Sequence, residues 1–215
     1  MTIRVVVVDD QAMVRAGLRM LLSQETEFRV VAEASNGIDA IAQAARFRPD
    51  VVLMDIRMPK LDGLEATRRI LTADQNAKVL VLTTFNLDEY VYEALRAGAS
   101  GFVLKDEPPE QLISAVKTVA AGDALLSPSV TRNVIAHFTR HRRQAPPPAV
   151  ETLTPRELDV FRLIASGRSN AEIGSELFIS DTTVKTHVTR LLQKLNVRDR
   201  AQAIVVAYQC NLFES

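Results

Sequence analysis

Five polar side chains follow directly after short apolar runs, where they could meet and do chemistry. They are Asp9, Asp10, Asp55, Thr83 and Lys105. Three carboxylates held close together repel one another unless they are protonated or bridged by a cation, and hard oxygen ligands suit Mg²⁺. A pocket with Mg²⁺, a lysine ammonium and a hydroxyl around one carboxylate can stabilise a phosphoryl group on that carboxylate.

A simpler explanation exists for each acidic residue taken alone, because aspartate after a strand often only caps the next helix. The pocket is favoured because five such groups stand at the ends of four apolar runs. In open α/β sheets, ligands bind beyond the carboxyl ends of the strands.

The elements that would position these residues alternate along the first 121 residues. β-branched runs of strand length occur at Ile3–Val8, Arg29–Ala34, Val51–Met54, Val79–Leu82 and Gly101–Leu104. Helical spacing occurs between them, at 14–22, 38–45, 64–71 and 91–95, and again at 112–119 behind Pro108-Pro109. The alternation predicts a doubly wound α/β domain with a five-stranded parallel sheet over residues 1–122. If the strand order is flavodoxin-like, the first and third strands are neighbours and the carboxylates share one pocket.

The second half of the chain has a different pattern. Residues 123–150 read as a linker, with a helix from Ser127-Pro128 and a basic, proline-rich hinge over 141–148. Residues 151–215 show only helical signals, in four helices of which the first begins with a capping box at Thr154 and Glu157. A short helix at 170–177, a turn at 178–180 and a longer helix to about Leu195 form a helix-turn-helix outline.

The longer helix has two distinct faces. One apolar stripe contains Val184, Val188, Leu191, Leu192 and Leu195. The opposite side presents Thr182, Lys185, Thr186, Thr189, Arg190 and Gln193. Short threonine side chains fit against base edges, and lysine and arginine suit guanine or phosphate, so this face predicts binding to double-stranded DNA. An ordinary helical bundle is the alternative, and we expect His187, on the flank, to be structural.

Composition limits the class of protein. The chain has 215 residues, 47% hydrophobic and 24% charged, which is typical of globular proteins. It carries 26 basic and 26 acidic residues, but the segment 1–130 has a net charge of −4 and the segment 182–200 of +4. The single cysteine, Cys210, excludes an internal disulfide, and no apolar run reaches the roughly 18 residues of a membrane span. We expect a soluble, cytoplasmic protein that does not enter a membrane.

The runs VVVVDDQ, VLMDIRMPKLDGLEA, VLVLTTF and GASGFVLKD resemble the receiver domain of two-component response regulators over about residues 1–122. The resemblance implies that Asp55 accepts a phosphoryl group from a sensor histidine kinase. It also implies that Asp9, Asp10, Asp55 and the main-chain oxygen of Arg57 hold Mg²⁺. Thr83 would be the phosphoryl-binding hydroxyl, Phe102 the aromatic switch and Lys105 the counter-ion. Asp106 departs from the pattern, since receivers often have proline after the lysine.

The stretch from LTPRELD to RDRAQAI resembles the LuxR-type helix-turn-helix along its whole length. Together with the receiver it places the chain among NarL/FixJ-type response regulators. The resemblance implies a phosphorylation-controlled transcriptional regulator that is not an enzyme beyond its own phosphorylation and slow dephosphorylation. In that family, the positions matching Lys185, Thr186 and Thr189 read the bases.

Two other classes can be weighed against this interpretation. A phosphohydrolase of the haloacid-dehalogenase kind needs Asp-x-Asp after its first strand, whereas here Asp55 follows the third strand and Arg57 stands two residues later. A constitutive DNA-binding protein with an inert receiver would not need the complete set of pocket residues.

The last helix, about Asp199–Gln209, has apolar residues on two sides. One stripe includes Ala203, Val206 and Cys210, and no other helix of so small a domain is an obvious partner for it. We therefore predict a homodimer through this stripe, formed on phosphorylation or on DNA, that binds an inverted-repeat site. The alternative is that the linker helix around Val134 and Phe138 covers the stripe within one chain.

Overall fold

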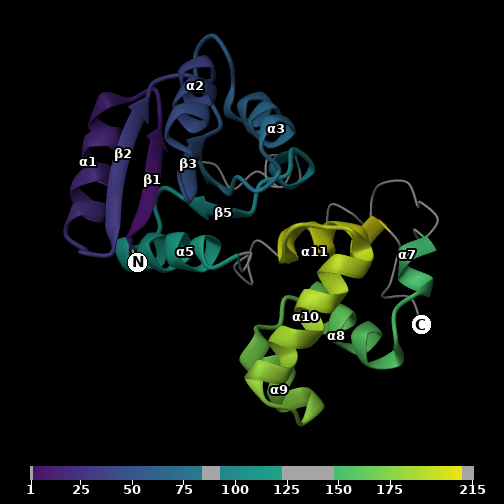
Figure 1. Cartoon of the computed structure of the whole chain (residues 1–215). Coiled ribbons are helices and arrows are strands. Elements are labelled where there is room, and N and C mark those ends of the chain that lie inside the picture. The colour runs from purple at the N-terminus through teal and green to yellow at the C-terminus, as the bar shows by residue number, and fades with distance from the viewer. Residues whose placement is uncertain (1, 84–92, 123–147, 210–215) are drawn as a thin grey trace. The chain divides into compact units, whose positions relative to one another are not determined.

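The computed structural model describes residues 2–83, 93–122 and 148–209. The chain divides into two compact units, Met1–Leu125 and Leu126–Ser215, which are described separately (Figure 1). The predicted linker helix, most of the predicted hinge and Cys210 lie outside the described residues. Within the described residues, no helix is long and apolar enough to cross a membrane.

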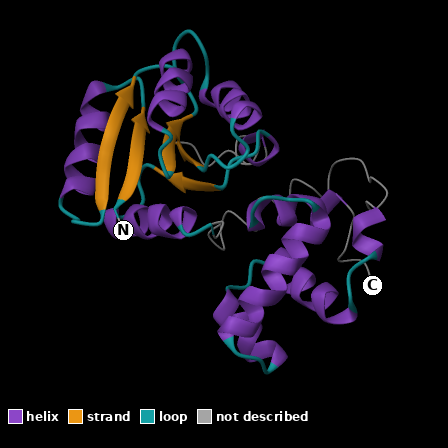
Figure 2. Ribbon diagram, viewed as in Figure 1, coloured by secondary structure: helices purple, strands orange, loops and turns teal. Residues whose placement is uncertain are grey.

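The first unit is built on a parallel sheet of five strands (Figure 2). The strands are β1 (Ile3–Val8), β2 (Phe28–Ala34), β3 (Val51–Asp55), β4 (Val79–Thr83) and β5 (Gly101–Leu104). Their order is β2-β1-β3-β4-β5, which confirms the predicted doubly wound, flavodoxin-like α/β fold. The first and third strands are hydrogen-bonded neighbours, with Val8 opposite Met54.

Helices cover both faces of this sheet (Figure 1). They are α1 (Ala12–Ser23), α2 (Gly37–Phe47), α3 (Gly63–Ala73) and α5 (Pro109–Ala120). Apolar residues of α1 and α5 pack in one core with Val5, Val7 and Leu53 of the strands, while α2 and α3 contact each other. Pro109 occupies the first turn of α5, as predicted. Of the predicted helix at 91–95, residues 93–95 are helical and the others lie outside the described residues.

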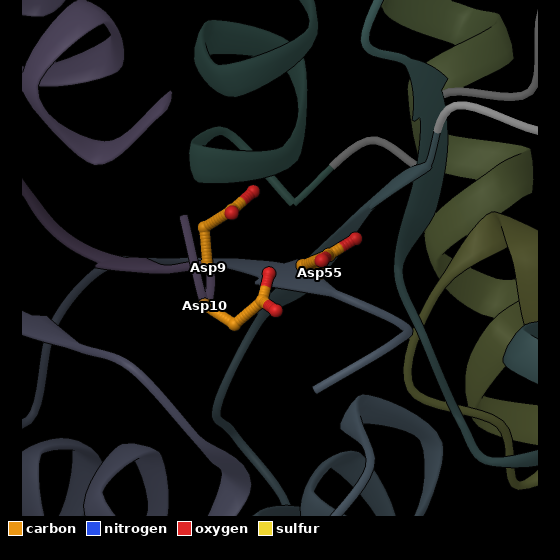
Figure 3. Close-up of side chains that lie close together, drawn as sticks. All are labelled: Asp9, Asp10 and Asp55. Atoms are coloured by element: carbon orange, nitrogen blue, oxygen red, sulfur yellow. The ribbon is translucent and has the colours of Figure 1, made fainter. Parts of the chain in front are cut away.

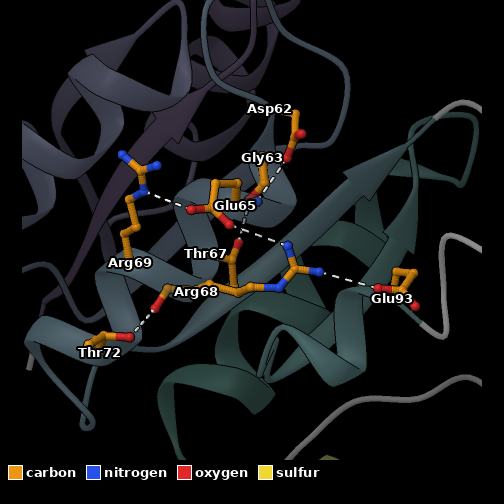
Figure 4. Close-up of polar contacts among 8 residues, drawn as sticks. All are labelled: Asp62, Gly63, Glu65, Thr67, Arg68, Arg69, Thr72 and Glu93. Carbon is orange, nitrogen blue, oxygen red and sulfur yellow. Dashed lines mark hydrogen bonds and ion pairs between the residues drawn. The ribbon is translucent and has the colours of Figure 1, made fainter.

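Helix α3 begins at a well-formed cap and is tied to its neighbour (Figure 4). The side chain of Asp62 accepts a hydrogen bond of 2.8 Å from the main-chain N–H of Glu65. Arg68 then pairs with Glu65 at 3.4 Å and with Glu93 at 3.2 Å, so this guanidinium links α3 to the next helical segment. Arg68 is exposed and the two glutamates are partly exposed, so we expect these pairs to add little stability.

Gly63 holds the start of α3 against the end of β3. Its N–H donates to the carbonyl of Ile56 at 2.8 Å, and a Cβ atom at this position would lie 1.9 Å from the carbonyl oxygen of Asp55. No other residue can stand here without moving the loop that follows Asp55, because the obstacle is main chain.

The second unit is entirely helical. It contains α7 (Pro148–Glu151), α8 (Pro155–Ala165), α9 (Asn170–Leu177), α10 (Asp181–Leu195) and α11 (Arg200–Gln209). The predicted capping box at Thr154 and Glu157 is confirmed, and Ser169 and Glu172 form a second one at the start of α9. The expectation that Pro148 belongs to a non-helical hinge is wrong, since proline is compatible with a first helical turn and Pro148 begins α7.

A tight turn joins α9 to α10 in the predicted helix-turn-helix. Phe178 has a left-handed backbone, with φ of 55°, and its side chain is 93% exposed. The N–H of Ile179 donates to the carbonyl of Gly174 at 2.9 Å, and a Cβ on Gly174 would lie 2.8 Å from the carbonyl of Ile179. Ser180 then caps α10 by accepting from the N–H of Thr183.

The structure corrects the predicted dimer stripe on α11. Ala203 and Ala207 have no exposed surface and belong to the core of their own domain, where α8 and α10 contact α11. The small alanine side chains allow the helices to approach closely, so this side of α11 is an internal face. Val206 is half-buried and packs against the same core, so only part of the stripe is open to a partner.

Glu157 is the polar centre of this domain. Its side chain is only 4% exposed, accepts a hydrogen bond of 2.8 Å from the N–H of Thr154 and lies 2.6 Å from the ammonium of Lys194. The hydrogen bond from Lys194 lowers the pKa of Glu157 to about 2, from an ordinary value of 4.5. Burial acts in the opposite direction, and the hydrogen bonds from Thr154 lower the pKa further. The ionised carboxylate thus joins the start of α8 to the end of α10.

We predict that Glu157→Gln destabilises the helical domain by about 1–3 kcal/mol at pH 7, the usual value of a charged hydrogen bond. A depressed pKa stabilises the fold above pH 4.5, and this contribution is lost as the pH falls from 4.5 towards 2. Urea unfolding followed by circular dichroism at pH 7 and pH 3 measures both effects, and the other carboxylates cancel because both proteins carry them. If Glu157→Gln lowered the free energy of unfolding at pH 3 by as much as at pH 7, the prediction would be contradicted.

Candidate functional site

Three carboxylates converge at the carboxyl ends of β1 and β3 (Figure 3). Oxygen atoms of Asp9, Asp10 and Asp55 all lie within 4.8 Å of one another. Asp9 and Asp55 are buried, with 0% and 6% exposure, whereas Asp10 is exposed. Because β1 and β3 are adjacent, residues 46 positions apart in the chain meet at one edge of the sheet.

Lys105, directly after β5, reaches into this cluster. Its ammonium lies 2.5 Å from Oδ2 of Asp9 and 3.0 Å from Oδ1 of Asp55. The other oxygen of Asp9 accepts a hydrogen bond of 2.9 Å from the N–H of Gln11. Among the described residues, the carboxylate of Asp10 has no hydrogen-bond or ion-pair partner.

Burial and charge act against each other in the pocket. Burial raises the pKa of Asp55 above its ordinary value, and the nearby Lys105 offsets only part of that effect. Burial alone would lower the pKa of Lys105, but its bonds to Asp9 and Asp55 outweigh this and raise it. The lysine therefore stays charged, whereas the positive charge of Lys105 does not fully compensate the burial of the Asp55 carboxylate.

A cavity of about 410 Å³ opens beside Asp10. Arg57 and Asp62 line it together with apolar residues of the loop after β3 and of the start of α3. A second cavity, of about 310 Å³, lies between α2 and α3, lined mainly by alanine and other apolar side chains near the amino ends of β3 and β4. It lies at the opposite end of the strands from the carboxylates, so of these two cavities the first is the one that can admit a ligand to them.

Thr83 and Phe102 lie on the last two strands of the sheet, β4 and β5. Thr83 ends β4 and is 4% exposed, and its carbonyl accepts a hydrogen bond of 2.7 Å from the N–H of Lys105. Phe102, on β5 opposite Val81, is 1% exposed. In the part of the chain that the structure describes there is no cis peptide bond, and Lys105–Asp106 is therefore trans.

The predicted DNA-reading residues share the exposed side of α10. Thr182, Lys185, Thr186, Thr189 and Arg190 are all exposed, whereas Val184, Val188, Leu191 and Leu195 are buried. Lys185 pairs with Asp181, one turn earlier, at 2.9 Å. His187 is half-buried, and its Nδ1 has no hydrogen-bond partner in the described parts of the chain.

The hydroxyls of two threonines are turned towards the helix itself. Thr186 donates to the carbonyl of Thr182 at 3.0 Å, and Thr189 donates to the carbonyl of Lys185 at 2.9 Å. Their hydrogen-bonding capacity towards a ligand is thereby reduced, because each hydroxyl proton is already donated within the helix.

Arg15 is a residue near the pocket that sequence reasoning did not identify. Its Nη1 donates to the main-chain oxygens of both Asp9 and Asp10, at 2.7 and 3.2 Å. Its position on α1 was visible, but the spacing gave no sign that the side chain turns back to the preceding loop, because helical periodicity reports burial and not hydrogen bonding.

Comparisons with known proteins agree with this geometry. The family model described as the response regulator receiver domain matches residues 5–117, and that described as bacterial regulatory proteins, luxR family, matches residues 151–207.

Relatives are similar over nearly the whole of this chain and of their own length. The uncharacterized transcriptional regulatory protein YxjL of Bacillus subtilis is 44% identical, over 95% of this chain and 94% of the relative. The response regulator protein VraR of Staphylococcus aureus is 41% identical over the whole of both chains. The crystal structure of the response regulator ChrA, from a heme-sensing two-component system, is 37% identical over 99% of both chains, with a TM-score of 0.54.

The matches cover both domains, and the sheet order and the helix-turn-helix agree with them. The chain therefore belongs to the NarL/FixJ-type response regulators, transcriptional regulators in which a receiver domain precedes a LuxR-type DNA-binding domain.

Proposed function

We propose that Asp55 accepts a phosphoryl group from a sensor histidine kinase and that this modification controls binding of the second domain to DNA. The observation that carries the proposal is the convergence of Lys105 and three carboxylates at the carboxyl ends of the strands of an open parallel sheet. In the transfer step, an Oδ of Asp55 attacks phosphorus and the bond from phosphorus to the kinase imidazole breaks. The imidazole keeps the electron pair and takes up a proton.

The donor set in the pocket fits Mg²⁺. Carboxylate oxygens are hard ligands, the carboxylate of Asp10 has no partner among the described residues, and Asp10 and Arg57 line the same cavity. Asp9, Asp10, Asp55 and the main-chain oxygen of Arg57 would hold the ion. When bound, Mg²⁺ supplies positive charge to the phosphoryl oxygens.

The remaining pocket residues have defined tasks in the proposal. Lys105 neutralises charge that develops on the phosphoryl oxygens, and Thr83 offers its hydroxyl to one of them. Phe102 would change its packing when Thr83 moves. Slow hydrolysis, in which water attacks phosphorus and releases inorganic phosphate, returns Asp55 to the carboxylate.

The DNA-reading part of the proposal rests on the exposed face of α10. Lys185, Thr186 and Thr189 would contact bases, with Thr182 and Arg190 beside them. A homodimer on an inverted-repeat site remains part of the proposal, with Val206 and Cys210 as the residues of the predicted stripe that could contribute. We place the protein in the cytoplasm, where a kinase and promoters are both accessible.

The first prediction is that Asp55→Asn abolishes phosphorylation while preserving the shape of the side chain. Wild-type protein incubated with Mg²⁺ and acetyl phosphate should gain one phosphoryl group by intact mass spectrometry, and the variant should gain none. Asp74→Asn, a change of an exposed aspartate after α3, is the matched control and should behave like the wild type. Modification of the Asp55 variant at the wild-type rate would refute the assignment.

A second prediction separates base contacts from phosphate contacts. Lys185→Ala should cost about 1–3 kcal/mol on the specific site and much less on random duplex, because a base contact carries sequence information. Arg190→Ala should weaken both equally and reduce the dependence on salt. Fluorescence anisotropy with both duplexes measures this, with Arg162→Ala on α8 as control. Equal losses on both duplexes for Lys185→Ala would show that this residue contacts only phosphate.

A third prediction follows from the internal bonds of the threonine hydroxyls. If Thr186 presents its methyl group, it contacts the methyl group of thymine, and Thr186→Val should bind like the wild type while Thr186→Ser loses about 1 kcal/mol. A duplex selected by the wild type from a random library provides the probe. Replacing its thymines by uracil, one at a time, should reproduce the loss at one position, and that position should make no difference to the serine variant. Tight binding by the serine variant with weak binding by the valine variant would instead assign the contact to the hydroxyl.

A further inference from the structure

Arg15 joins α1 to the loop that carries two of the three pocket carboxylates. Its side chain is 18% exposed, and Nη1 bridges the main-chain oxygens of Asp9 and Asp10. On its other side, Nε lies 3.4 Å from a carboxylate oxygen of Glu33 on β2. Glu33 also pairs with Arg19, one turn further along α1.

The two aspartates differ in how their side chains are held. Asp9 is fixed at both oxygens, by the N–H of Gln11 and by the ammonium of Lys105. For Asp10, the described residues hold the main chain and not the carboxylate: Arg15 donates a hydrogen bond to its main-chain oxygen. The direction of the Asp10 carboxylate therefore depends on how its main chain is oriented.

We propose that Arg15 is a positioning residue for the divalent-cation site. By bonding both carbonyl oxygens it fixes the peptide planes on either side of Asp10, so that the Asp10 carboxylate turns towards Asp9 and Asp55. Glu33 orients the guanidinium through Nε and balances its charge. The inference rests on the proposed binding of Mg²⁺ at these aspartates.

Charge and positioning predict opposite effects of removing Arg15. A cation close to the site repels a divalent ion, so loss of the charge alone would tighten metal binding. Loss of positioning weakens it, because partners that orient metal ligands typically contribute about 10–100-fold to affinity. The sign of the change therefore identifies which effect dominates.

Arg15→Met and Arg19→Met form a matched pair for the experiment. Each keeps the aliphatic stem, removes one guanidinium from the same helix and breaks one ion pair with Glu33, but only Arg15 contacts the aspartate carbonyls. The probe is Mn²⁺, and free Mn²⁺ is measured by electron paramagnetic resonance with the full chain, with Mg²⁺ as competitor. Circular dichroism and urea midpoints show whether both variants keep the fold.

We expect Mn²⁺ to bind about tenfold more weakly to Arg15→Met and within about twofold of wild type to Arg19→Met. Unchanged or tighter binding by Arg15→Met, or an equal loss in both variants, would overturn the proposal. If Arg15→Met does not fold, Glu33→Gln is the variant to measure. It removes the ion pair that orients the guanidinium but keeps the Arg15 donors, so it should weaken Mn²⁺ binding to a smaller extent. Unaltered Mn²⁺ binding by Glu33→Gln would then overturn the proposal. Asp10→Ala separates this from the proposed function, because wild-type affinity in that variant would show that Asp10 does not hold the ion, whatever Arg15 does.

Discussion

The ion pairs of Lys105 with Asp9 and Asp55 are the interaction on which the receiver unit depends. The strand order places β1 beside β3, which brings two buried carboxylates together, and such a pair is unfavourable unless a positive charge lies between them. Lys105 follows β5, two strands away from β3, so its long side chain crosses the end of β4 to reach them. Thr83 ends that intervening strand and therefore stands beside the path of the ammonium. One lysine thus connects three strands that are distant in sequence.

Much of this arrangement could be predicted from the sequence because the strands carry clear signals. β1 and β5 begin and end at the predicted residues, and Asp55 and Thr83 only lengthen β3 and β4 by one residue each. The contacts of Arg15 could not be predicted, since they require the register that sets Val7 opposite Glu33 and the exact rotation of α1. Ala203 was misassigned for a different physical reason, because alanine suits an open surface and a close helix contact equally well. Periodicity locates elements, but it does not determine which neighbour covers a small side chain.

The exposed face of α10 combines weak interactions that DNA can replace. The ion pair between Lys185 and Asp181 is solvent-exposed, and such pairs contribute about 0.2–1 kcal/mol. Exchanging it for a guanine edge or a phosphate therefore costs little, while Asp181 limits non-specific attraction to the polyanion. The domain's stability comes from elsewhere, from the core around Phe161 and Leu191 and from buried Glu157. The proposed reading surface and the folding core therefore lie on opposite sides of the same helix.

The charges of the pocket explain why phosphorylation would be felt beyond Asp55. Three carboxylates and one ammonium leave two negative charges, which one divalent cation would balance. Arg15 does not change this count, because Glu33 pairs with it. A phosphoryl group on Asp55 replaces one negative charge with about two. Lys105 contacts both Asp9 and Asp55 in the unmodified pocket, so under the proposal the added charge would draw it towards the phosphoryl oxygens and weaken its bond to Asp9. The N–H of Lys105 is bonded to the carbonyl of Thr83, which means that a shift of the lysine main chain is transmitted directly to β4 and its threonine.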